Sequence, residues 1–493
     1  MANREFTVEG EHRYNRSSPV RWIISHALRY PWLPLAAVVA SIASNALTSY
    51  SRVLVGDAFR FVTTPGATLQ GLLTIAILVG GARAGHALLQ LARNVSVEFL
   101  AQRMERDTRE EFYISLLGKS LTFHSRQRVG DLMARATNDV RQINLMMNPG
   151  ANLIFDSLVG TVVPIVAIAS IRLELVIVPA LFVLLLAITL RDYTAKLNPV
   201  SDAMRQQFGV MNAGLAESIS GIEVVKAYAQ EKQEQRKFER EARRFRDYFV
   251  EQGEIRARYL PFLVYAFATA GALLHALLLH FADPAFDVGD IIAFMGLVAL
   301  LRFPTFLSLF SFNLVQLGIS GAQRILELIT TSSEMDENEE GVRQRITGEV
   351  EFQNVTFGYG DNGPVLRDIT FRAQPGETIA IVGGTGSGKT TLTRLINRVY
   401  DVDAGRVLVD GIDVREWSLE SLRSQISAIE QDVFLFSRAI GENIAFGVGM
   451  RADEEAIVYS AREAQAHGFI EGLPQGYATE IGERGVTLSG GQR

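Results

Sequence analysis

Apolar and polar residues are unevenly distributed along this 493-residue chain. The segment up to residue 330 contains six long apolar stretches, whereas the remainder has short apolar runs between turn residues. A helix crosses the roughly 30 Å hydrocarbon core of a bilayer with about 20 apolar residues, because its backbone groups must be hydrogen-bonded internally there. We therefore predict six membrane-spanning helices, at residues 32–55, 68–91, 151–171, 175–190, 259–281 and 291–314. A buried core helix is the alternative for any one stretch, but six in one chain argue against it.

Lysine and arginine in the connections between these stretches indicate their orientation. Two of the short connections contain one arginine each, Arg60 and Arg172, and the third, 281–290, contains none. The N-terminal segment and the two long connections, 92–150 and 191–258, are rich in arginine and lysine. Positive charge gathers on the cytoplasmic side of membrane proteins. We therefore expect both termini in the cytoplasm.

The two long connections keep a helical, charge-rich pattern. The segment SVEFLAQRMERDTREEFYISLLGKS (96–120) contains no proline and has apolar residues at helical spacing, among them Phe99, Met104 and Phe112. A solvated or disordered charged run would lack this spacing. We expect the spans to continue as helices well into the cytoplasm.

The composition agrees with two parts of different character. Hydrophobic residues make up 48% of the chain, too much for an ordinary soluble protein, yet 21% charged residues exclude a chain that lies wholly in the membrane. The net charge of −6 indicates no particular partner. The chain contains no cysteine, which excludes disulfides, thiolate metal sites and a cysteine nucleophile. The first thirty residues are too polar for a cleavable signal peptide.

An acidic, polar segment at 331–345 is expected to be a linker. Beyond it, ETIAIVGGTGSGKTTLTRLI (377–396) predicts a buried strand at 379–382, a glycine-rich loop and a helix from Thr391. The spacing is that of a P-loop, in which glycines let backbone N–H groups converge on an anion at a helix N-terminus. Lys389 is expected to reach the β- and γ-phosphates of ATP, and the Thr390 hydroxyl to bind Mg²⁺. The predicted ATP-binding residues are Gly383, Gly384, Thr385, Gly386, Ser387, Gly388, Lys389, Thr390 and Thr391.

Two further residues have an ordinary interpretation beside the functional one. The run RSQISAIEQDVFLFS (423–437) predicts another strand ending at Gln431, whose amide could contact Mg²⁺ or the attacking water. A glutamine after a strand is, however, most often a surface residue. The run VEFQNVTFGYG (350–360) alternates like a strand and ends near Tyr359. Tyr359 is either a core aromatic or, beside a P-loop, a ring on which adenine stacks.

These motifs together resemble those of the ATP-binding cassette (ABC) exporters, in the half-transporter form whose membrane domain precedes the cassette in one chain. The resemblance extends from about residue 20 to the end of the chain. In the cassette it rests on Tyr359 in FGYG, GGTGSGKTT (383–391), EQDVFLFS (430–437), TEIGERG (479–485) and LSGGQ (488–492), in this order. The membrane part is similar at HSRQRVGDLMARATNDV (124–140), LAESISGIEVVKAYAQE (215–231) and SGAQRILELI (320–329).

The resemblance implies an α-helical six-span transmembrane domain of the type I ABC exporter fold, followed by an α/β P-loop NTPase cassette that is incomplete at its C-terminus. The implied parts are a cytoplasmic N-terminal segment (1–30), the transmembrane domain (31–330), the linker (331–345) and the nucleotide-binding domain (346–493). Short helices near 128–139 and 216–226 would dock on the cassettes. Their glycines, Gly130 and Gly221, are otherwise simple helix breakers.

The family also implies ATP-driven export of a hydrophobic or amphiphilic substrate, a drug or a lipid, by alternating access in a dimer in the bacterial plasma membrane. Each ATP, with Mg²⁺ held by Thr390 and Gln431, would lie between one P-loop and the partner's LSGGQ motif. Ser489 would face the γ-phosphate, where negative charge develops. The residues implied to bind ATP in trans are Leu488, Ser489, Gly490, Gly491 and Gln492. The partner is a second copy or a related half-transporter.

The sequence departs from the family pattern in two places. Glu430 stands where many members have proline, and we expect it to affect only the stiffness of that loop. After LSGGQ, residues 1–493 do not contain the family's strand with its Mg²⁺-binding aspartate and general-base glutamate, or its later histidine; His467 precedes the motif. A general base contributes roughly 10²–10⁴-fold to a rate. We therefore expect that the chain as written does not hydrolyse ATP at a useful rate.

Two functions are open on the sequence. One is an exporter whose C-terminal part lies beyond this sequence, and the other is a non-hydrolytic, truncated or regulatory subunit that binds ATP and pairs with another half-transporter. The intact Lys389 and LSGGQ favour the exporter, and the DNA that follows codon 493 would distinguish the two. Six membrane spans exclude a soluble P-loop ATPase of the DNA-repair type, and we expect no nucleic-acid partner.

Ionisable residues inside the predicted spans are the only sequence signal for a substrate. They are Arg83, His86, His275 and Arg302. Such groups usually face a cavity or a partner side chain. They either bond to neighbouring helices or form a basic patch in the cavity that favours anionic amphiphiles or lipids.

Overall fold

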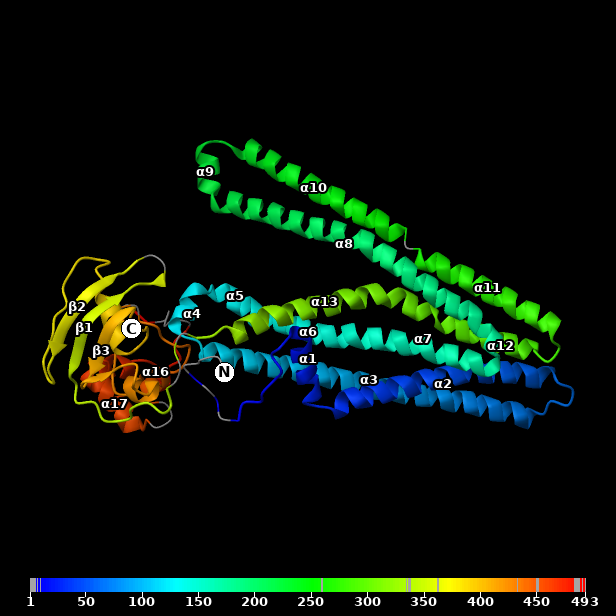
Figure 1. The fold of residues 1–493 in the computed structure, drawn as a ribbon, viewed down its shortest axis with the longest axis horizontal. Coiled ribbons are helices and arrows are strands. Elements are labelled where there is room, and N and C mark those ends of the chain that lie inside the picture. The colour runs from blue at the N-terminus through cyan, green and yellow to red at the C-terminus, as the bar shows by residue number, and fades with distance from the viewer. Residues whose placement is uncertain are drawn as a thin grey trace. The chain divides into compact units, whose positions relative to one another are not determined.

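The structure, a computed structural model, describes residues 6, 8, 10–258, 260–333, 335, 338–360, 363–431, 433–448, 452–482, 488–489 and 491–492, with the backbone alone at 305–310. The chain divides into two compact units (Figure 1). The helical unit comprises His12–Tyr113 and Val129–Thr330. The cassette unit comprises Met1–Glu11, Ile114–Arg128 and Thr331–Arg493.

The helical unit consists of long helices joined by short turns. Its helices are α1 (Pro19–Leu28), α2 (Trp32–Thr63), α3 (Leu69–Leu117, whose last turn belongs to the cassette unit), α5 (Val129–Ala134), α6 (Val140–Leu145), α7 (Asn152–Ile171), α8 (Ile177–Ser220), α9 (Ile222–Ala227), α10 (Glu231–Ala257), α11 (Pro261–Ala282), α12 (Val288–Leu300) and α13 (Arg302–Thr330). Two π-helical turns, Arg135–Asp139 and Met146–Ala151, connect α5, α6 and α7, and a 3₁₀ turn, Leu173–Val176, precedes α8.

Five helical stretches among the described residues are long and apolar enough to cross a membrane. They are Trp32–Thr63, Leu69–Leu117, Val129–Ile171, Leu173–Ser220 and Glu231–Ala282, and each overlaps one of the first five predicted spans. Tyr259, the first residue of the fifth predicted span, lies outside the described residues.

The sixth predicted span, 291–314, falls on α12 and α13, which are separate helices that meet at Leu301. Pro304 accounts for the break. It has no N–H to donate to the carbonyl of Leu300, and its ring crowds that carbonyl. A sixth crossing by these two helices stays a prediction.

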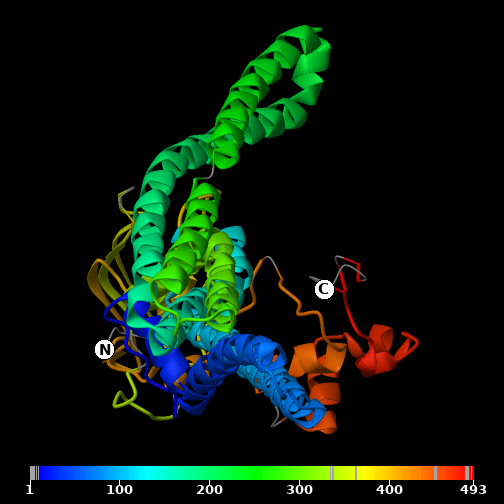
Figure 2. The same cartoon turned by 90° about the vertical axis from the view of Figure 1, so that its right-hand side faces the viewer.

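The expected helical continuation beyond the spans is confirmed. α3 has 49 residues and α8 has 44, and at 1.5 Å per residue each is more than twice as long as the roughly 30 Å hydrocarbon core is thick. α8, α9 and α10 form a hairpin that projects from the other helices of this unit (Figures 1 and 2). Phe208 of α8 and Phe245 of α10 contact each other across the hairpin, with ring centroids 5.5 Å apart.

The two segments expected to dock on cassettes are short helical pieces. Residues 128–139 form α5 and the π-helical turn after it, and residues 216–226 form the end of α8 and most of α9. Gly221 does end a helix, since it separates α8 from α9, whereas Gly130 lies within α5.

The cassette unit contains a four-stranded sheet. Its strands are β1 (Val350–Phe357), β2 (Leu366–Ala373), β3 (Ala404–Val409) and β4 (Ile412–Asp413), in the order β2-β1-β3-β4, and every pairing is antiparallel. β1 confirms the strand predicted at the start of 350–360. α14 (Lys389–Ile396) and α15 (Leu419–Arg423) pack on the sheet through a buried core that includes Phe352, Leu395 and Trp417.

A second, helical cluster follows in the chain. It contains α16 (Ile440–Ile444), α17 (Glu454–Glu463) and α18 (His467–Glu471), with 3₁₀ turns at Ala445–Gly447 and Gly476–Ala478. Its buried residues are Ile440, Ala461, Ile470, Ile481 and Leu488.

Two segments predicted as strands are not strands in the structure. In 379–382, the side chains of Ile379 and Ile381 are each 40% exposed and that of Val382 is 89% exposed. In the run towards Gln431, Ile429 is 99% exposed. An apolar run becomes a strand only when another strand completes its hydrogen-bond ladder, and within the described residues neither run has a strand beside it.

Candidate functional site

The glycine-rich loop ends in a turn that requires glycine. Gly388 is the N-cap of α14 and has φ +91°, in the left-handed region. A Cβ at this position would also lie 2.7 Å from Cδ2 of Leu366 on β2. The loop therefore enters the helix at an angle that other residues cannot adopt without strain. α14 begins at Lys389, two residues earlier than the sequence predicts.

Lys389 folds back over this loop. Its ammonium group donates hydrogen bonds to the carbonyl oxygens of Gly383 (3.0 Å) and Gly384 (2.8 Å). The Lys389 charge is thus held above the loop that would receive phosphate. Thr390, which follows, is exposed at the N-terminus of α14, where its hydroxyl is accessible to a cation. The residues present therefore fit a Mg²⁺–nucleotide complex.

Tyr359 lies beside the start of α14. Its hydroxyl is 2.9 Å from Oγ1 of buried Thr391, and its ring packs edge-on against Phe357 and Tyr400, with centroids 5.1 and 5.3 Å apart. The Thr391 hydroxyl thus faces Tyr359. Tyr359 itself is 39% exposed, so part of its ring is available for stacking while the rest belongs to an aromatic group.

The loop that contains Gln431 is tied to the same helix. Arg394 of α14 and Glu430 form an ion pair at 3.4 Å. Glu430 stands where many family members have proline. It therefore gives this loop an ion pair with the P-loop helix that a proline could not form. Gln431 is exposed.

The LSGGQ motif is attached to the helical cluster of the cassette. Leu488 is buried among its apolar residues, whereas Ser489, Gly491 and Gln492 are exposed. The Ser489 N–H donates to Oε1 of Gln492, and the Gln492 N–H donates to the Ser489 carbonyl, both at 3.0 Å. Gly490 lies outside the described residues, as do residues 483–485 of TEIGERG. The P-loop helix packs in the sheet core and the motif in a separate core.

Of the four ionisable residues singled out in the spans, His86 is bound to a neighbouring helix. Its Nδ1 lies 2.8 Å from Oγ of Ser44 and 2.9 Å from Oγ1 of Thr48, both on α2. His275 lies on α11, and its Nδ1 is buried without a hydrogen-bond partner among the described residues. Arg302 is at the first position of α13 and is exposed.

Exposed Arg83 has a second arginine in its neighbourhood that the sequence interpretation did not single out. Arg52 of α2 lies close enough to Arg83 of α3 for their positive charges to interact. The Nε of Arg52 is buried and has no hydrogen-bond partner in the part of the chain that the structure describes. No carboxylate of that part lies within ion-pair distance of either arginine. The signal was available, because Arg52 is a charged residue inside the predicted span 32–55.

A second polar group joins α2, α3 and α7. Asp156 of α7 forms an ion pair with Arg93 of α3 and accepts hydrogen bonds from Ser41 (3.0 Å) and Asn45 (3.3 Å) of α2. This carboxylate lies inside the predicted span 151–171. Its partners come from two other helices, so only the folded arrangement identifies them.

Comparison with known proteins adds family membership to this geometry. A family model described as "ABC transporter transmembrane region" matches residues 35–305, and one described as "ABC transporter" matches residues 366–493.

Individual relatives agree with these matches. The chain is 32% identical over 477 residues to an "ATP-dependent lipid A-core flippase" of Syntrophus aciditrophicus, an alignment that covers 95% of this chain and 77% of the relative. It is 31% identical over 406 residues to a "Fatty acid ABC transporter ATP-binding/permease protein" of Mycobacterium bovis, covering 81% and 63%. The fold is similar to that of a "bacterial Atm1-family ABC exporter with ATP bound", with a TM-score of 0.73, 27% identity, and coverage of 94% of this chain and 82% of that one.

Proposed function

This chain belongs to the ABC transporter family, with transmembrane region and cassette in one polypeptide, and from that premise we propose that it is one half of an ATP-driven exporter. It is an integral membrane protein of a family that hydrolyses ATP. One observation carries the proposal: apolar membrane helices, a P-loop with Lys389 at the start of α14, and LSGGQ follow one another in a single chain. In this proposal ATP closes two cassettes on each other, and the membrane cavity alternates between the cytoplasm and the outside.

Nucleotide binding is assigned to the loop and the start of α14. The backbone N–H groups of Gly384, Gly386 and Ser387 and the dipole of α14 would receive the phosphates. Lys389 would exchange its two carbonyl acceptors for phosphate oxygens. Thr390 and Gln431 would hold Mg²⁺, which neutralises phosphate charge when bound. Tyr359 would stack on the adenine with its exposed part.

The signature motif is proposed to act on the ATP of a partner. Two features support a dimer. The P-loop and LSGGQ pack in different cores of the cassette. The cytoplasmic hairpin α8–α9–α10 also carries large apolar side chains that are at least 40% exposed, including Phe208, Leu215, Ile219, Phe249 and Val250. Large apolar side chains that stay exposed outside the membrane indicate a protein interface. A second copy or a related half-transporter would cover it, with the termini in the cytoplasm and the assembly in a bacterial plasma membrane.

The substrate is proposed to be an anionic amphiphile or lipid. The relatives named a lipid A-core flippase and a fatty acid transporter are consistent with this class. The supporting feature of this chain is the pair Arg52 and Arg83, two positive charges near one another inside the spans. An anionic headgroup would offset their repulsion, because unpaired charges in a membrane are costly.

This substrate proposal has a direct test. Arg83→Ala and Arg52→Ala should each lower transport of an anionic lipid analogue about tenfold, the effect of losing one charge-assisted contact, and leave transport of a neutral analogue within about twofold. Equal transport of the anionic analogue by the wild type and both variants would contradict it.

Hydrolysis is a separate matter from binding. A polypeptide consisting only of residues 1–493 is expected to bind ATP but not to hydrolyse it at a useful rate, because it contains no general base after LSGGQ.

The experiment is nucleotide binding and turnover by the purified 493-residue polypeptide. A fluorescent ATP analogue should bind with Mg²⁺, and Lys389→Ala should weaken binding at least tenfold. Arg372→Ala, which removes an exposed cation of β2 outside the assigned ATP site, should not change it. Turnover near that of longer family members would refute the expected lack of hydrolysis, and unchanged binding by Lys389→Ala would refute the assigned ATP site.

A further inference from the structure

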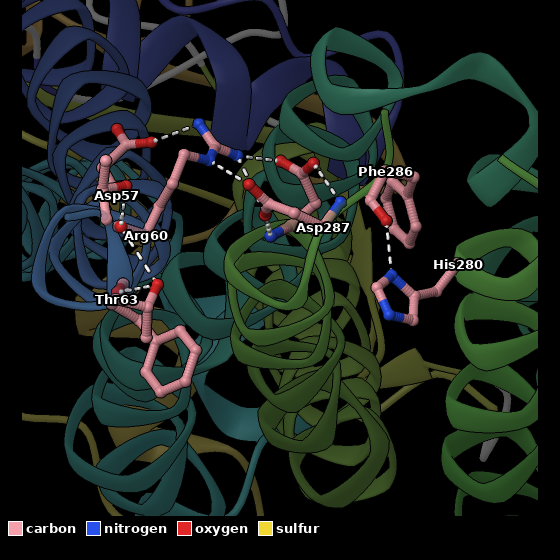
Figure 3. Close-up of polar contacts among 9 residues, drawn as sticks. Asp57, Arg60, Thr63, His280, Phe286 and Asp287 are labelled. Carbon is pink, nitrogen blue, oxygen red and sulfur yellow. Dashed lines mark hydrogen bonds and ion pairs between the residues drawn. The ribbon is translucent and has the colours of Figure 1, made fainter. Parts of the chain in front are cut away.

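Four charged side chains join the ends of α2 and α12 that lie at the poorly basic, outer connections (Figure 3). Arg60, in the last turn of α2, lies between carboxylates of both helices. Its Nε is 2.5 Å from Oδ2 of Asp287, its Nη2 is 2.5 Å from Oδ1 of Asp290, and its Nη1 is 3.2 Å from Oδ1 of Asp57. We refer to Asp57, Arg60, Asp287 and Asp290 as the Arg60 cluster.

The two carboxylates contributed by α12 are fixed by the start of that helix. Asp287 is its N-cap and accepts a hydrogen bond from the N–H of Asp290 at 3.0 Å, while the Asp287 N–H donates to Oδ2 of Asp290 at 3.2 Å. This reciprocal capping box orders both side chains before Arg60 binds them. Arg60 therefore joins α2 to the fixed first turn of α12. Burial would raise the pKa of Asp287, but hydrogen bonds from Arg60 and the Asp290 N–H bring it below its ordinary value, as expected for a carboxylate held in an ion pair.

One helical turn before Arg60 along α2, the backbones of α2 and α12 are in contact. A Cβ added to Gly56 would lie 2.4 Å from the carbonyl oxygen of Gly289 and 2.8 Å from Cβ of Ala293. A Cβ added to Gly289 would lie 2.7 Å from the carbonyl oxygen of Gly56. Both glycines are buried, and no larger residue fits while the helices keep this distance. The Arg60 cluster thus lies at the outer edge of the closest approach of these two helices.

The charge balance of the cluster makes it a contact that can open. Three carboxylates contact one guanidinium, and Arg172 acts on Asp290 only from beyond ion-pair distance. Without Arg60 the carboxylate of Asp57 on α2 would therefore face those of Asp287 and Asp290 on α12 with little compensation. The same cation that holds the helices together therefore offsets a repulsion that would separate them. Arg60 and Asp287 are partly exposed, and ion pairs in contact with water contribute little each. Such a contact stabilises the arrangement in which α2 and α12 touch, without preventing the one in which they are apart.

We propose that the Arg60 cluster, together with the Gly56–Gly289 contact, is a latch that closes the outer end of the transporter between α2 and α12 while the cavity faces the cytoplasm, and that it separates when the cavity opens outward. This inference rests on the alternating access proposed above. An exporter that releases its substrate outward has to separate helices at this end, and the latch determines how readily α2 leaves α12.

The chain contains no cysteine, so the latch can be measured without background labelling. Spin labels would be attached at Thr63, the last residue of α2, and at Ala285, just before α12; both are exposed. Labelled chains are diluted into an excess of unlabelled chains in nanodiscs, so that each distance reports a single chain. Electron–electron distances are then recorded without nucleotide and with Mg²⁺ and a non-hydrolysable ATP analogue.

The wild type should give one short distance without nucleotide and a longer one with the ATP analogue. Arg60→Gln should show the longer distance already without nucleotide, with the ratio of open to closed chains raised about tenfold, the size expected for losing partly solvated ion pairs. Gly56→Val should do the same by a route that leaves all four charges in place. Lys196→Gln is the control: it removes an exposed ion pair within α8, with Asp192, whose residues lie outside the Arg60 cluster and do not connect α2 to α12.

The outcomes separate the latch from the function on which it rests. If the wild-type distance responds to the ATP analogue but Arg60→Gln and Gly56→Val, both eluting as folded protein, match the wild type and Lys196→Gln, the latch is wrong and alternating access stands. If the wild-type distance never responds to nucleotide, the proposed alternating access is contradicted and the latch is overturned with it.

Discussion

The carboxylate of Asp410 accepts four hydrogen bonds from the segment that leads into β1. The donors are the N–H and Oγ1 of Thr347 and the N–H groups of Gly348 and Glu349, at 2.6 to 3.0 Å. Burial would raise the pKa of Asp410, but these hydrogen bonds lower it below its ordinary value. Asp410 is therefore ionised at a lower pH in the folded cassette than in the unfolded chain.

This residue gives a prediction for the pH dependence of stability. The contribution of Asp410 is complete above the unfolded pKa of about 3.9 and is lost as the pH falls through the lower, folded pKa. Asp410→Asn should reduce the free energy of unfolding of the cassette by about 1–3 kcal/mol at pH 7, and by less as the pH approaches 3. The measurement is urea unfolding in detergent, followed by the fluorescence of buried Trp417. Glu416→Gln removes an exposed carboxylate nearby and should change neither quantity; a uniform loss at every pH would contradict the assignment.

Single residues were predictable where a motif specifies them and not where folding brings them together. The P-loop spacing predicts that Lys389 and Thr390 act on nucleotide, because glycines and a following helix define such a loop, and the structure places both at the start of α14. The sequence alone did not show that Arg83 lies near Arg52, or that Asp156 binds Arg93. A charged residue within a span predicts a partner, but the partner's position depends on helix rotation and register, which apolar periodicity does not determine.

At the scale of elements, the turn between α3 and α4 is tied to the linker that follows α13. The Lys119 ammonium donates to the carbonyl of Thr331, and the N–H of Ser120 donates to Oγ of Ser333 at 3.1 Å. Lys119, Ser120 and Ser333 are buried, and all of these groups belong to the cassette unit. α4 (Leu121–Arg126) begins directly after this tie, with Ser120 as its N-cap.

Removing the tie should loosen both segments together. Lys119→Met keeps the length of the side chain but leaves the Thr331 carbonyl without this donor, at a local cost of about 1–3 kcal/mol. Hydrogen exchange should become roughly tenfold faster in α4 and in residues 331–333, because opening is local in proteins. Lys226→Met, a change in an exposed ion pair of α9, serves as the control. Unchanged exchange in α4 with faster exchange elsewhere would show that Lys119 does not hold this junction.

The elements themselves were predicted unequally well. A membrane helix satisfies its own backbone, so an apolar stretch of sufficient length predicts it without knowledge of its neighbours. The first five spans could be predicted for this reason, and the charged helical pattern of residues 96–120 predicted the helical extension. The apolar runs at 379–382 and before Gln431 form no strands, because a strand depends on a partner that the run itself does not encode. The division of the sixth predicted span at Leu301 follows from Pro304, a signal present in the sequence.

At the scale of the whole molecule, the proposed transport cycle uses three surfaces of the chain. The P-loop and Gln431 lie on one part of the cassette, the exposed LSGGQ residues on another, and the apolar hairpin α8–α9–α10 on the helical unit. A second half-transporter would use the last two, because ATP must lie between a P-loop and a partner's signature in the proposed dimer. The Arg60 cluster then closes the outer end, and ATP binding has to work against it.

The central claim is that nucleotide held by this P-loop drives outward transport of an amphiphile. The most direct measurement is uptake of a fluorescent anionic lipid analogue by inside-out vesicles that contain the natural gene product, with and without Mg²⁺–ATP. The account predicts uptake that requires Mg²⁺–ATP and falls to background in Lys389→Ala, while Arg372→Ala, which removes an exposed cation of β2 outside the assigned ATP site, transports like the wild type. Uptake by Lys389→Ala equal to that of the wild type, or uptake that is independent of ATP, would contradict it.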